Sequence, residues 1–229
     1  MVTVRAYRSV IRERSAALTR NAILSAAEEL FAKNGYTLTT VSQVADAAEV
    51  AANTVYTVFG GKAALVVALA DRGMADPVIG QTLDGVRTAA DGVTVIRAAS
   101  AGTCTTARRQ AKTIAILHDN VAADPLIAEA AGRADGLQRD RLSQIASRLA
   151  ELGALRDGTG QAEAADILWY YLGHASWRML RRMGWTWQRC EAWLNEQVSA
   201  ALLHRVGSQE GLPDSRGPDL VSSAVHALS

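Results

Sequence analysis

Apolar residues recur at helical spacing along nearly the whole of this chain of 229 residues. They return at i, i+3, i+4 and i+7, which places them on one face of an α-helix, whereas the strict alternation typical of a strand never persists. The fold class is therefore expected to be all-α. The length suits one or two domains with room for a sizeable core.

Short helices are indicated in the N-terminal part of the chain. A helical pattern covers about residues 19–33, and Gly35 is placed to end it. Thr40 and Gln43 match a capping box, so a second helix is expected from Thr40 to about Ala47. Both helices are expected to pack in a small N-terminal core.

A third short helix is expected over residues 52–58, after a turn at residues 48–51 and before a Gly-Gly pair. A fourth helical pattern runs from Lys62 to about residue 75, where an Asp-Pro pair interrupts it. Two short helices joined by a tight turn and braced by another helix match a helix-turn-helix, whose second short helix enters the DNA major groove.

Small side chains that suit base recognition occupy the outward face of this recognition helix. The residues expected to meet base edges are Ala52, Asn53, Thr54 and Thr57. Asn53 can form two hydrogen bonds with adenine, and Ala52 can contact a thymine methyl group. The threonines can donate or accept a hydrogen bond while also offering a methyl group.

Three further side chains are placed to hold DNA phosphates: Thr40 at a helix N-terminus, the phenol of Tyr56 and the ammonium of Lys62. Such contacts fix the register of a protein on DNA without reading the sequence. The alternative is an ordinary helical hairpin, in which Tyr56 is a half-buried aromatic residue and the threonines act as caps.

The net charge of +1, taken alone, argues against nucleic-acid binding, but the charge is unevenly distributed. Up to residue 20 the chain carries five arginines against the single acid Glu13, so this segment resembles a basic arm. Arg12, Arg14 and Arg20 are candidates to enter a minor groove beside the recognition helix.

Residues 23–65 resemble the signature of the tetracycline-repressor (TetR) family. The matching positions are 23–27, 30–32, 35–36, 39–41, 44–45, 48–51 and 54–56, with Phe59, Lys62 and Leu65. The resemblance implies an all-helical homodimer, in which each subunit joins a three-helix DNA-binding head to a larger ligand-binding body. It also implies a transcriptional repressor that a small molecule releases from DNA.

The chain departs from the family pattern in two places. Glu49 stands where the family commonly has a turn glycine, and a left-handed backbone is unfavourable for a residue with a Cβ. Ala51 and Ala52 replace the usual polar cap and basic residue of the recognition helix. We therefore expect DNA affinity to depend on Lys62 and on the N-terminal arm.

The chain is predicted to divide into residues 1–62, the basic arm and helix-turn-helix domain, and residues 63–229, an effector-binding and dimerisation domain. Past the fourth helix, helices are expected at about residues 93–103, 105–122, 125–152, 162–183 and 186–205. Residues 207–218 are expected to form a loop or tail.

Two apolar stripes in the last helices indicate a dimer interface. One comprises Ala165, Trp169, Leu172, Ser176, Met179 and Met183. The other comprises Trp187, Cys190, Leu194, Val198 and Ala201. Their steps of three and four residues suit helix pairing, and the resemblance implies a four-helix interface between subunits. The alternative is that both stripes belong to the core of a monomer.

Candidate ligand-binding residues are His118, Tyr170, Tyr171, His174 and Trp177. The last four mix aromatic and polar groups within one helical pattern, as small-molecule pockets do, whereas His118 interrupts an apolar run. The alternative places them in the core, at an interface or at a solvated edge. No cofactor is indicated beyond a small-molecule effector of unidentified structure.

No metal site is indicated, because the four histidines show no i, i+3 or i, i+4 pairing and have no cysteine nearby. Cys104 and Cys190 lack metal-ligand spacing and are typical of reduced thiols in a cytosolic protein. A redox role would need an exposed, electropositive thiol. No secretion signal or membrane-spanning run is found, so a cytoplasmic location is expected.

The expected function is a ligand-responsive transcriptional repressor that binds a palindromic operator as a homodimer. A transcriptional activator with the same head is one alternative. A helical carrier or enzyme for a small molecule is another. Against the enzyme stands the lack of a Gly-rich phosphate loop, a nucleophile elbow or a paired acid-base motif.

Overall fold

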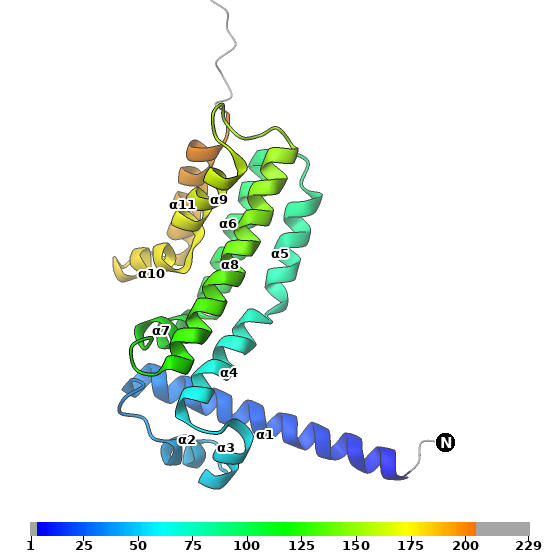
Figure 1. Ribbon diagram of the computed structural model, residues 1–229, viewed down its shortest axis with the longest axis vertical. Helices are drawn as coiled ribbons and strands as arrows, with labels where there is room; N and C mark the ends of the chain where they lie inside the picture. Colours follow the sequence, from blue (N-terminus) through cyan, green and yellow to red (C-terminus); the bar gives the residue numbers. More distant parts are fainter. Residues whose placement is uncertain (1–3, 205–229) are drawn as a thin grey trace, which may run out of the picture.

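A computed structural model describes the backbone of residues 4–204, with side chains from Glu13 onward. In this part of the chain the fold is all-α, with eleven helices and one isolated β-bridge between Leu155 and Leu203. Figure 1 shows an elongated body of long helices standing on a small head, with the first helix lying across their junction. The predicted fold class is confirmed.

The head consists of α1 (Val4–Asn34), α2 (Val41–Ala47) and α3 (Ala52–Phe59), and α4 (Lys62–Met74) leads into the body. The predicted capping box of α2 is present. The Gln43 amide donates to the Thr40 hydroxyl at 3.2 Å, and the Thr40 amide donates to Gln43 Oε1 at 2.9 Å. Gly60 ends α3 in a left-handed conformation. The predicted order of short helices is confirmed.

Helix α1 is longer than predicted. It begins at Val4 rather than near residue 19, so the segment expected to form a basic arm is helical from there onward. Figure 1 shows the first half of α1 projecting beyond the other head helices. A helix is compatible with this composition, because arginine is a good helix former and neither glycine nor proline occurs within α1.

The body consists of α5 (Pro77–Thr88), α6 (Gly92–Arg109), α7 (Ala111–Asp119), α8 (Pro125–Glu151), α9 (Gln161–Leu172), α10 (His174–Arg182) and α11 (Trp187–Leu202). In Figure 1, α5, α6 and α8 run along the long axis, while α9, α10 and α11 cover one side. Helices α8 and α11 lie close to their predicted positions. The tail predicted at residues 207–218 lies outside the described residues.

Helix α5 is missing from the sequence-based prediction. The Asp-Pro pair expected to break the chain instead starts this helix, because the Asp76 carboxylate accepts a hydrogen bond from the Val78 amide at 3.0 Å. Pro77 occupies the first turn, where its missing N–H is harmless. Two glycines weaken the helical pattern of α5, but the helix packs along α6 and is stabilised by that contact.

Two helix breaks also differ from the prediction. The break expected between the helices at residues 93–103 and 105–122 is absent, because α6 is continuous to Arg109. The chain instead breaks near Gln110, where α6 ends and α7 begins. The helix expected over residues 162–183 is divided at Gly173, whose backbone is extended. A Cβ at Gly173 would lie 2.4 Å from the Trp169 carbonyl oxygen, so the break requires glycine.

Two hydrophobic cores lie within the described part of the chain. The first joins α1, α2 and α3 to α4, α7 and the start of α8, where Leu69 and Ile127 are fully buried. The second fills the body around Trp177. Since the first core continues past residue 62, α4 belongs to the packing of both head and body.

The apolar stripe predicted on the last helix faces the interior. Cys190, Leu194 and Val198 are fully buried in the body core, where α11 packs on α6 and α9. The expectation that this stripe faces a second subunit is therefore wrong, and the alternative of a core position is correct for α11. The other stripe is interrupted by the break between α9 and α10, and its Met179 is 58% exposed.

Across residues 4–204, no individual helix has the length and apolar character needed to cross a membrane. One pair, α3 with the segment Lys62–Thr88, meets that test only when taken together, with a bend of 58°.

Candidate nucleic-acid interface and ligand cavity

Helices α2 and α3 are held together as a helix-turn-helix by buried valines. Val44 of α2 and Val55 of α3 are fully buried in the head core, and Val50 of the turn packs against it. Glu49 adopts φ 56°, the left-handed conformation that glycine most easily supplies. The turn therefore keeps this conformation although it lacks a glycine.

The outward face of α3 carries the residues predicted to meet base edges. Asn53 and Thr57 are exposed, as is Tyr56, whereas Ala52 and Thr54 are half-buried. The Thr57 hydroxyl donates to the Asn53 carbonyl at 2.8 Å, which leaves its oxygen able to accept a further hydrogen bond. The structure thus presents the Asn53 amide and two hydroxyl groups to solvent on one short helix.

The first turn of α3 has no side-chain cap, because Ala51 precedes it. A helix leaves its first amide groups without intrahelical partners, and these suit a phosphate oxygen. Thr40 differs, because its hydroxyl already accepts from the Gln43 amide as the cap of α2. Its own proton can still be donated to a phosphate.

Lys62 contacts the loop between α1 and α2. Its Nζ donates to the Tyr36 carbonyl at 3.0 Å and to the Thr37 carbonyl at 3.3 Å. It also lies 4.3 Å from the centre of the Tyr36 ring, in cation–π contact. Lys62 therefore fixes α4 to the loop that precedes α2, a positioning role that its place in the sequence did not suggest.

The arginines predicted to reach a minor groove have different surroundings. The Arg20 guanidinium lies 4.4 Å from the centre of the Phe59 ring, so it packs α1 against the end of α3. Arg14 is exposed on α1. The side chain of Arg12 lies outside the described residues.

Two small cavities adjoin each other in the body. The first lies among α5, α6, α8 and α10, and the second lies among α4, α6, α7 and α8; each has a volume of about 30 Å³. Such a volume holds roughly two water molecules. The side chains that line both cavities are Ile79, Thr106, Gln138, Arg141 and His174. Movement of this shared wall would join the two spaces.

Three of the five predicted ligand-binding residues lie at these cavities. His174 and Trp177 line the first cavity, and His118 lines the second. Tyr170 and Tyr171 line neither; they pack edge to face against each other on α9, and Tyr170 is 71% exposed. The prediction placed them beside His174 on one continuous helix, and the break at Gly173 separates them from it.

Arg141 of α8 is a cavity residue that sequence reasoning missed. Its guanidinium donates to the Met74 carbonyl at 3.1 Å, and among the described residues no carboxylate is in ion-pair contact with it. Burial lowers the pKa of Arg141 from its ordinary value, but an arginine in a protein stays protonated. The wall between the cavities therefore carries a positive charge without an anionic partner.

Burial also affects the two histidines at the cavities. The pKa of His174 is lowered to about 4, mainly by burial and also by the charges of His118, Arg141 and Arg178. Burial likewise lowers the pKa of His118, against the opposing effect of Asp135. His174 is therefore neutral at pH 7.

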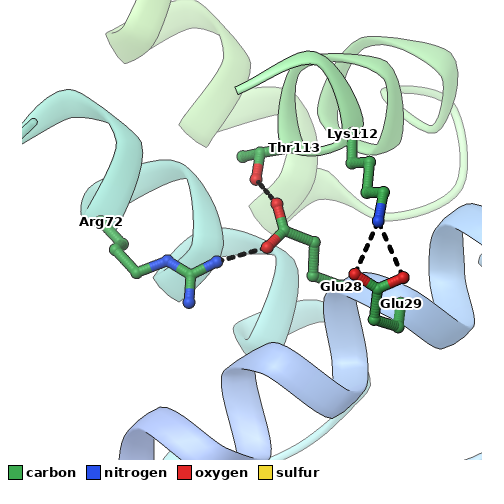
Figure 2. A network of polar contacts seen from close by, with 5 residues as sticks. All are labelled: Glu28, Glu29, Arg72, Lys112 and Thr113. Carbon is green, nitrogen blue, oxygen red and sulfur yellow. Dashed lines mark hydrogen bonds and ion pairs between the residues drawn. The ribbon is translucent and has the colours of Figure 1, made fainter. Parts of the chain in front are cut away.

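A polar network connects the head with the body (Figure 2). The Glu28 carboxylate of α1 accepts hydrogen bonds from Arg72 of α4 at 2.6 Å and from Thr113 of α7 at 2.5 Å. Lys112 of α7 contacts both oxygens of Glu29, at 2.6 and 2.8 Å. Helix α7, which also lines the second cavity, is thus in direct polar contact with α1.

Neither cysteine has the setting of a redox sensor. Cys104 and Cys190 are both buried. Burial raises the pKa of the Cys104 thiol to about 12 and also raises that of Cys190. Since the thiolate is the reactive form, these are inert core thiols in this conformation.

Comparison with curated proteins gives no match. Residues 23–69 match the family model described as "Bacterial regulatory proteins, tetR family". This segment contains α2 and α3, and it reaches from the buried part of α1 into α4.

Solved structures share the fold over most of the chain. FadR, the fatty acid degradation regulator of Bacillus halodurans, superposes with a TM-score of 0.69 at 16% identity, over 82% of this chain and 97% of its own. The SmeT–triclosan complex, from Stenotrophomonas maltophilia, gives 0.66 at 23% identity, over 88% and 99%. FadR of Bacillus subtilis with stearoyl-CoA gives 0.66 at 16% identity, over 80% and 98%.

The local match and the overall fold agree with the geometry of α2 and α3. Both indicate a helix-turn-helix head on a helical body. Residues 23–69 are thus similar to the tetR family of bacterial regulatory proteins, and the chain has the fold of the FadR and SmeT structures.

Proposed function

We propose that this protein is a ligand-responsive transcriptional repressor that binds a palindromic operator as a homodimer and is released by a small-molecule effector. The observation that carries the proposal is the exposed face of α3, where Asn53, Tyr56 and Thr57 stand on a frame of buried valines. The protein acts by binding rather than by catalysis, on DNA in the cytoplasm.

In the proposed complex, α3 lies in the major groove. Asn53 and Thr57 read base edges, and the half-buried Ala52 and Thr54 offer methyl groups to them. Tyr56, the Thr40 hydroxyl and the uncapped amides of α3 hold phosphates. Lys62 keeps its contacts to the loop before α2 and has a third proton for a phosphate.

A palindromic operator requires two heads related by two-fold symmetry. Support for a dimer comes from large apolar side chains that a single subunit leaves exposed on its last three helices and at the C-terminal end of α10. They are Tyr170, Met179, Met183 and Trp193. Burial against a second subunit would remove this apolar surface from water, which favours association. The proposed interface therefore uses outward residues of α9, α10 and α11 rather than the buried stripe of α11.

The cavity lining suggests the chemistry of the effector. Arg141 supplies an unpaired cation on a wall shared by both cavities, while Leu142, Ile145 and Trp177 give the first cavity an apolar side. An amphipathic anion, such as a carboxylate with an apolar chain, fits this combination. Known ligand sites usually exceed about 300 Å³, so binding must move side chains and join the two cavities. Among similar structures, FadR of Bacillus subtilis is described with stearoyl-CoA and SmeT with triclosan.

Effector binding has a direct route to the head. The second cavity is lined by Ile114, Leu117 and His118 of α7. Lys112 and Thr113, just before them on the same helix, contact Glu29 and Glu28 of α1. A shift of α7 that opens the cavity would therefore move α1. This movement would change the distance between the two DNA-binding heads of the dimer. We propose that, in the effector-bound dimer, the distance between the two recognition helices no longer matches the distance between successive major grooves.

The test is a gel-shift titration of the purified full chain on DNA that flanks its own gene, across a series of salt concentrations. Selective binding should weaken with salt and should fall about 10- to 100-fold for Asn53→Ala, the loss expected for one base contact. Gln161→Ala removes an exposed amide at the start of α9 and serves as the matched control. Equal affinity of wild type and Asn53→Ala would contradict the proposed use of α3.

Transcription from a reporter carrying the bound fragment decides the direction of regulation. A fall in transcription that depends on Asn53 supports a repressor. A rise in transcription would instead show an activator with the same head.

A further inference from the structure

Three side chains able to bind a metal ion meet at the edge of the second cavity. They are His118 of α7, Asp135 of α8 and His174 of α10, and their ligand atoms all lie within 4.8 Å of one another. His118 Nε2 and Asp135 Oδ1 are 3.7 Å apart. The ring centres of the two histidines are 5.7 Å apart. Because the residues come from three helices, no local spacing in the sequence indicates this group.

One of these atoms has no partner in the protein. His118 Nε2 is buried without a hydrogen bond, since 3.7 Å to Asp135 is too long for one. A buried polar atom of this kind is uncommon and costs about 1–3 kcal/mol unless an ion or a water molecule satisfies it. The unsatisfied nitrogen points to a missing ligand rather than to a simple core histidine.

We propose that His118, Asp135 and His174 bind a divalent transition-metal ion, for which Zn²⁺ has the best fit. Two imidazoles and a carboxylate are donors that zinc accepts, whereas Mg²⁺ and Ca²⁺ prefer oxygen ligands throughout. Zinc bonds of about 2.0–2.2 Å in a tetrahedral arrangement place ligand atoms roughly 3.4 Å apart. Small side-chain movements bring the three ligand atoms to that separation.

Nearby charges favour Asp135 as the anion of the site. The other carboxylate in the neighbourhood, Asp119, is in contact with Arg178 and lies 3.9 Å from Arg182. Arg141 is held by the Met74 carbonyl. Positive charge from Arg141 and Arg178 acts on His174 and makes the site weaker than a closed structural zinc site. With three protein ligands, the fourth position stays open to water or to a donor atom of a second ligand.

The site joins three helices, one of which contacts the head. Helix α7 carries His118 and also Lys112 and Thr113, whose side chains contact α1 (Figure 2). A metal ion would tie α7 to α8 and α10 and so restrain the helix between cavity and head. This role is independent of the identity of the effector.

The experiment is a titration of the EDTA-treated full chain with Zn²⁺ by calorimetry and with Co²⁺ by visible absorption. We expect one equivalent of each ion, with cobalt d–d bands typical of four or five ligands. His118→Gln, Asp135→Asn and His174→Gln should each weaken Zn²⁺ binding at least about 100-fold, since losing even an outer-shell partner costs 10- to 100-fold. His204→Gln is the matched control, because exposed His204 lies 4.0 Å from Asp157 without a third ligand.

Of the three ligand variants, Asp135→Asn changes the shape of the side chain least. It therefore separates loss of metal binding from loss of the fold. Zn²⁺ should raise the Tm of wild type but not of Asp135→Asn, provided that the variant keeps the helical circular dichroism of wild type. Absence of cobalt bands in wild type would overturn the proposal. Unchanged Zn²⁺ affinity in all three ligand variants, or loss of binding in His204→Gln, would overturn it as well.

Discussion

Glu28 of α1 and Arg72 of α4 form an ion pair of 2.6 Å at the junction of head and body (Figure 2). The second Glu28 oxygen accepts a hydrogen bond from Thr113 of α7, so one carboxylate of α1 contacts both α4 and α7. The Glu28 side chain is 18% exposed, which screens the pair less than a fully solvated one. The junction is therefore joined by specific polar contacts as well as by the shared apolar core.

A double-mutant cycle with Glu28→Gln and Arg72→Met should measure this contact. We expect a coupling free energy of about 1 kcal/mol in urea unfolding, the upper end for partly exposed ion pairs. Arg87 and Asp84 provide the control, because their side chains are 72% and 65% exposed and should couple by less than about 0.5 kcal/mol. Equal coupling in the two pairs would show that the junction contact is an ordinary surface pair.

Glu49→Gly should stabilise the protein. A residue with a Cβ in the left-handed region costs about 1–2 kcal/mol, and Glu49 has φ 56°. Glycine removes that strain, but it also raises the conformational entropy of the unfolded chain. This second effect lowers the stability by about 0.4–1 kcal/mol. The expected net gain is roughly 0.5–1 kcal/mol by urea unfolding. Glu49→Ala keeps a Cβ and should give no such gain; a gain equal to that of glycine would exclude strain as its cause.

Local signals predicted α2 and α3 well. The capping box at Thr40 and the ends of α2 and α3 each depend on residues within one or two turns of helix. Helix α5 and the break at Gly173 depend instead on what packs against them, namely α6 and the Trp169 carbonyl. Sequence periodicity reports which face of a helix is apolar, but it does not report where a neighbouring element interrupts the helix.

Gly173→Ala should destabilise the body by about 1–3 kcal/mol. The new Cβ would lie 2.4 Å from the Trp169 carbonyl oxygen, which is part of the backbone and cannot rotate away. Gly136→Ala is the control, because Gly136 lies inside α8 with open space around its Cβ position. It should stabilise by roughly 0.5–1 kcal/mol, the helix preference of alanine over glycine. Thermal unfolding of both variants distinguishes the effects, and a neutral Gly173→Ala would contradict the close approach.

The thiols of Cys104 and Cys190 should be unreactive in the folded protein. Burial raises the pKa of Cys104 to about 12, so only about one molecule in 10⁴ carries the thiolate at pH 8. Reaction with an aromatic disulfide reagent at pH 8 should be slow in buffer and complete within minutes in urea. Each protein chain should then release two equivalents of the reagent's thiol, one for each cysteine. Fast modification in buffer, together with loss of DNA binding, would instead support the redox alternative.

The candidate ligand site was only partly accessible to sequence reasoning. Aromatic and polar residues near Trp177 were visible as a pattern, and His174 and Trp177 do line the first cavity. The pattern groups Tyr170 with these residues only if the helix continues unbroken through Gly173, and it does not. Arg141 and Asp135 carry no local signal, since what distinguishes each is its neighbours from distant helices.

Arg141→Met should remove the preference of the cavity for an anion. If the unpaired guanidinium recognises a carboxylate, wild type binds decanoate more tightly than decanol, because a charge-assisted hydrogen bond contributes about 1.5–3 kcal/mol. The variant should lose roughly 10- to 100-fold in decanoate affinity and keep its affinity for decanol, measured by quenching of tryptophan fluorescence. Arg139→Met on the same helix is the control, since Arg139 lies over the Trp169 ring and outside both cavities. Equal weakening of acid and alcohol by Arg141→Met would mean that this residue shapes the cavity wall without selecting charge.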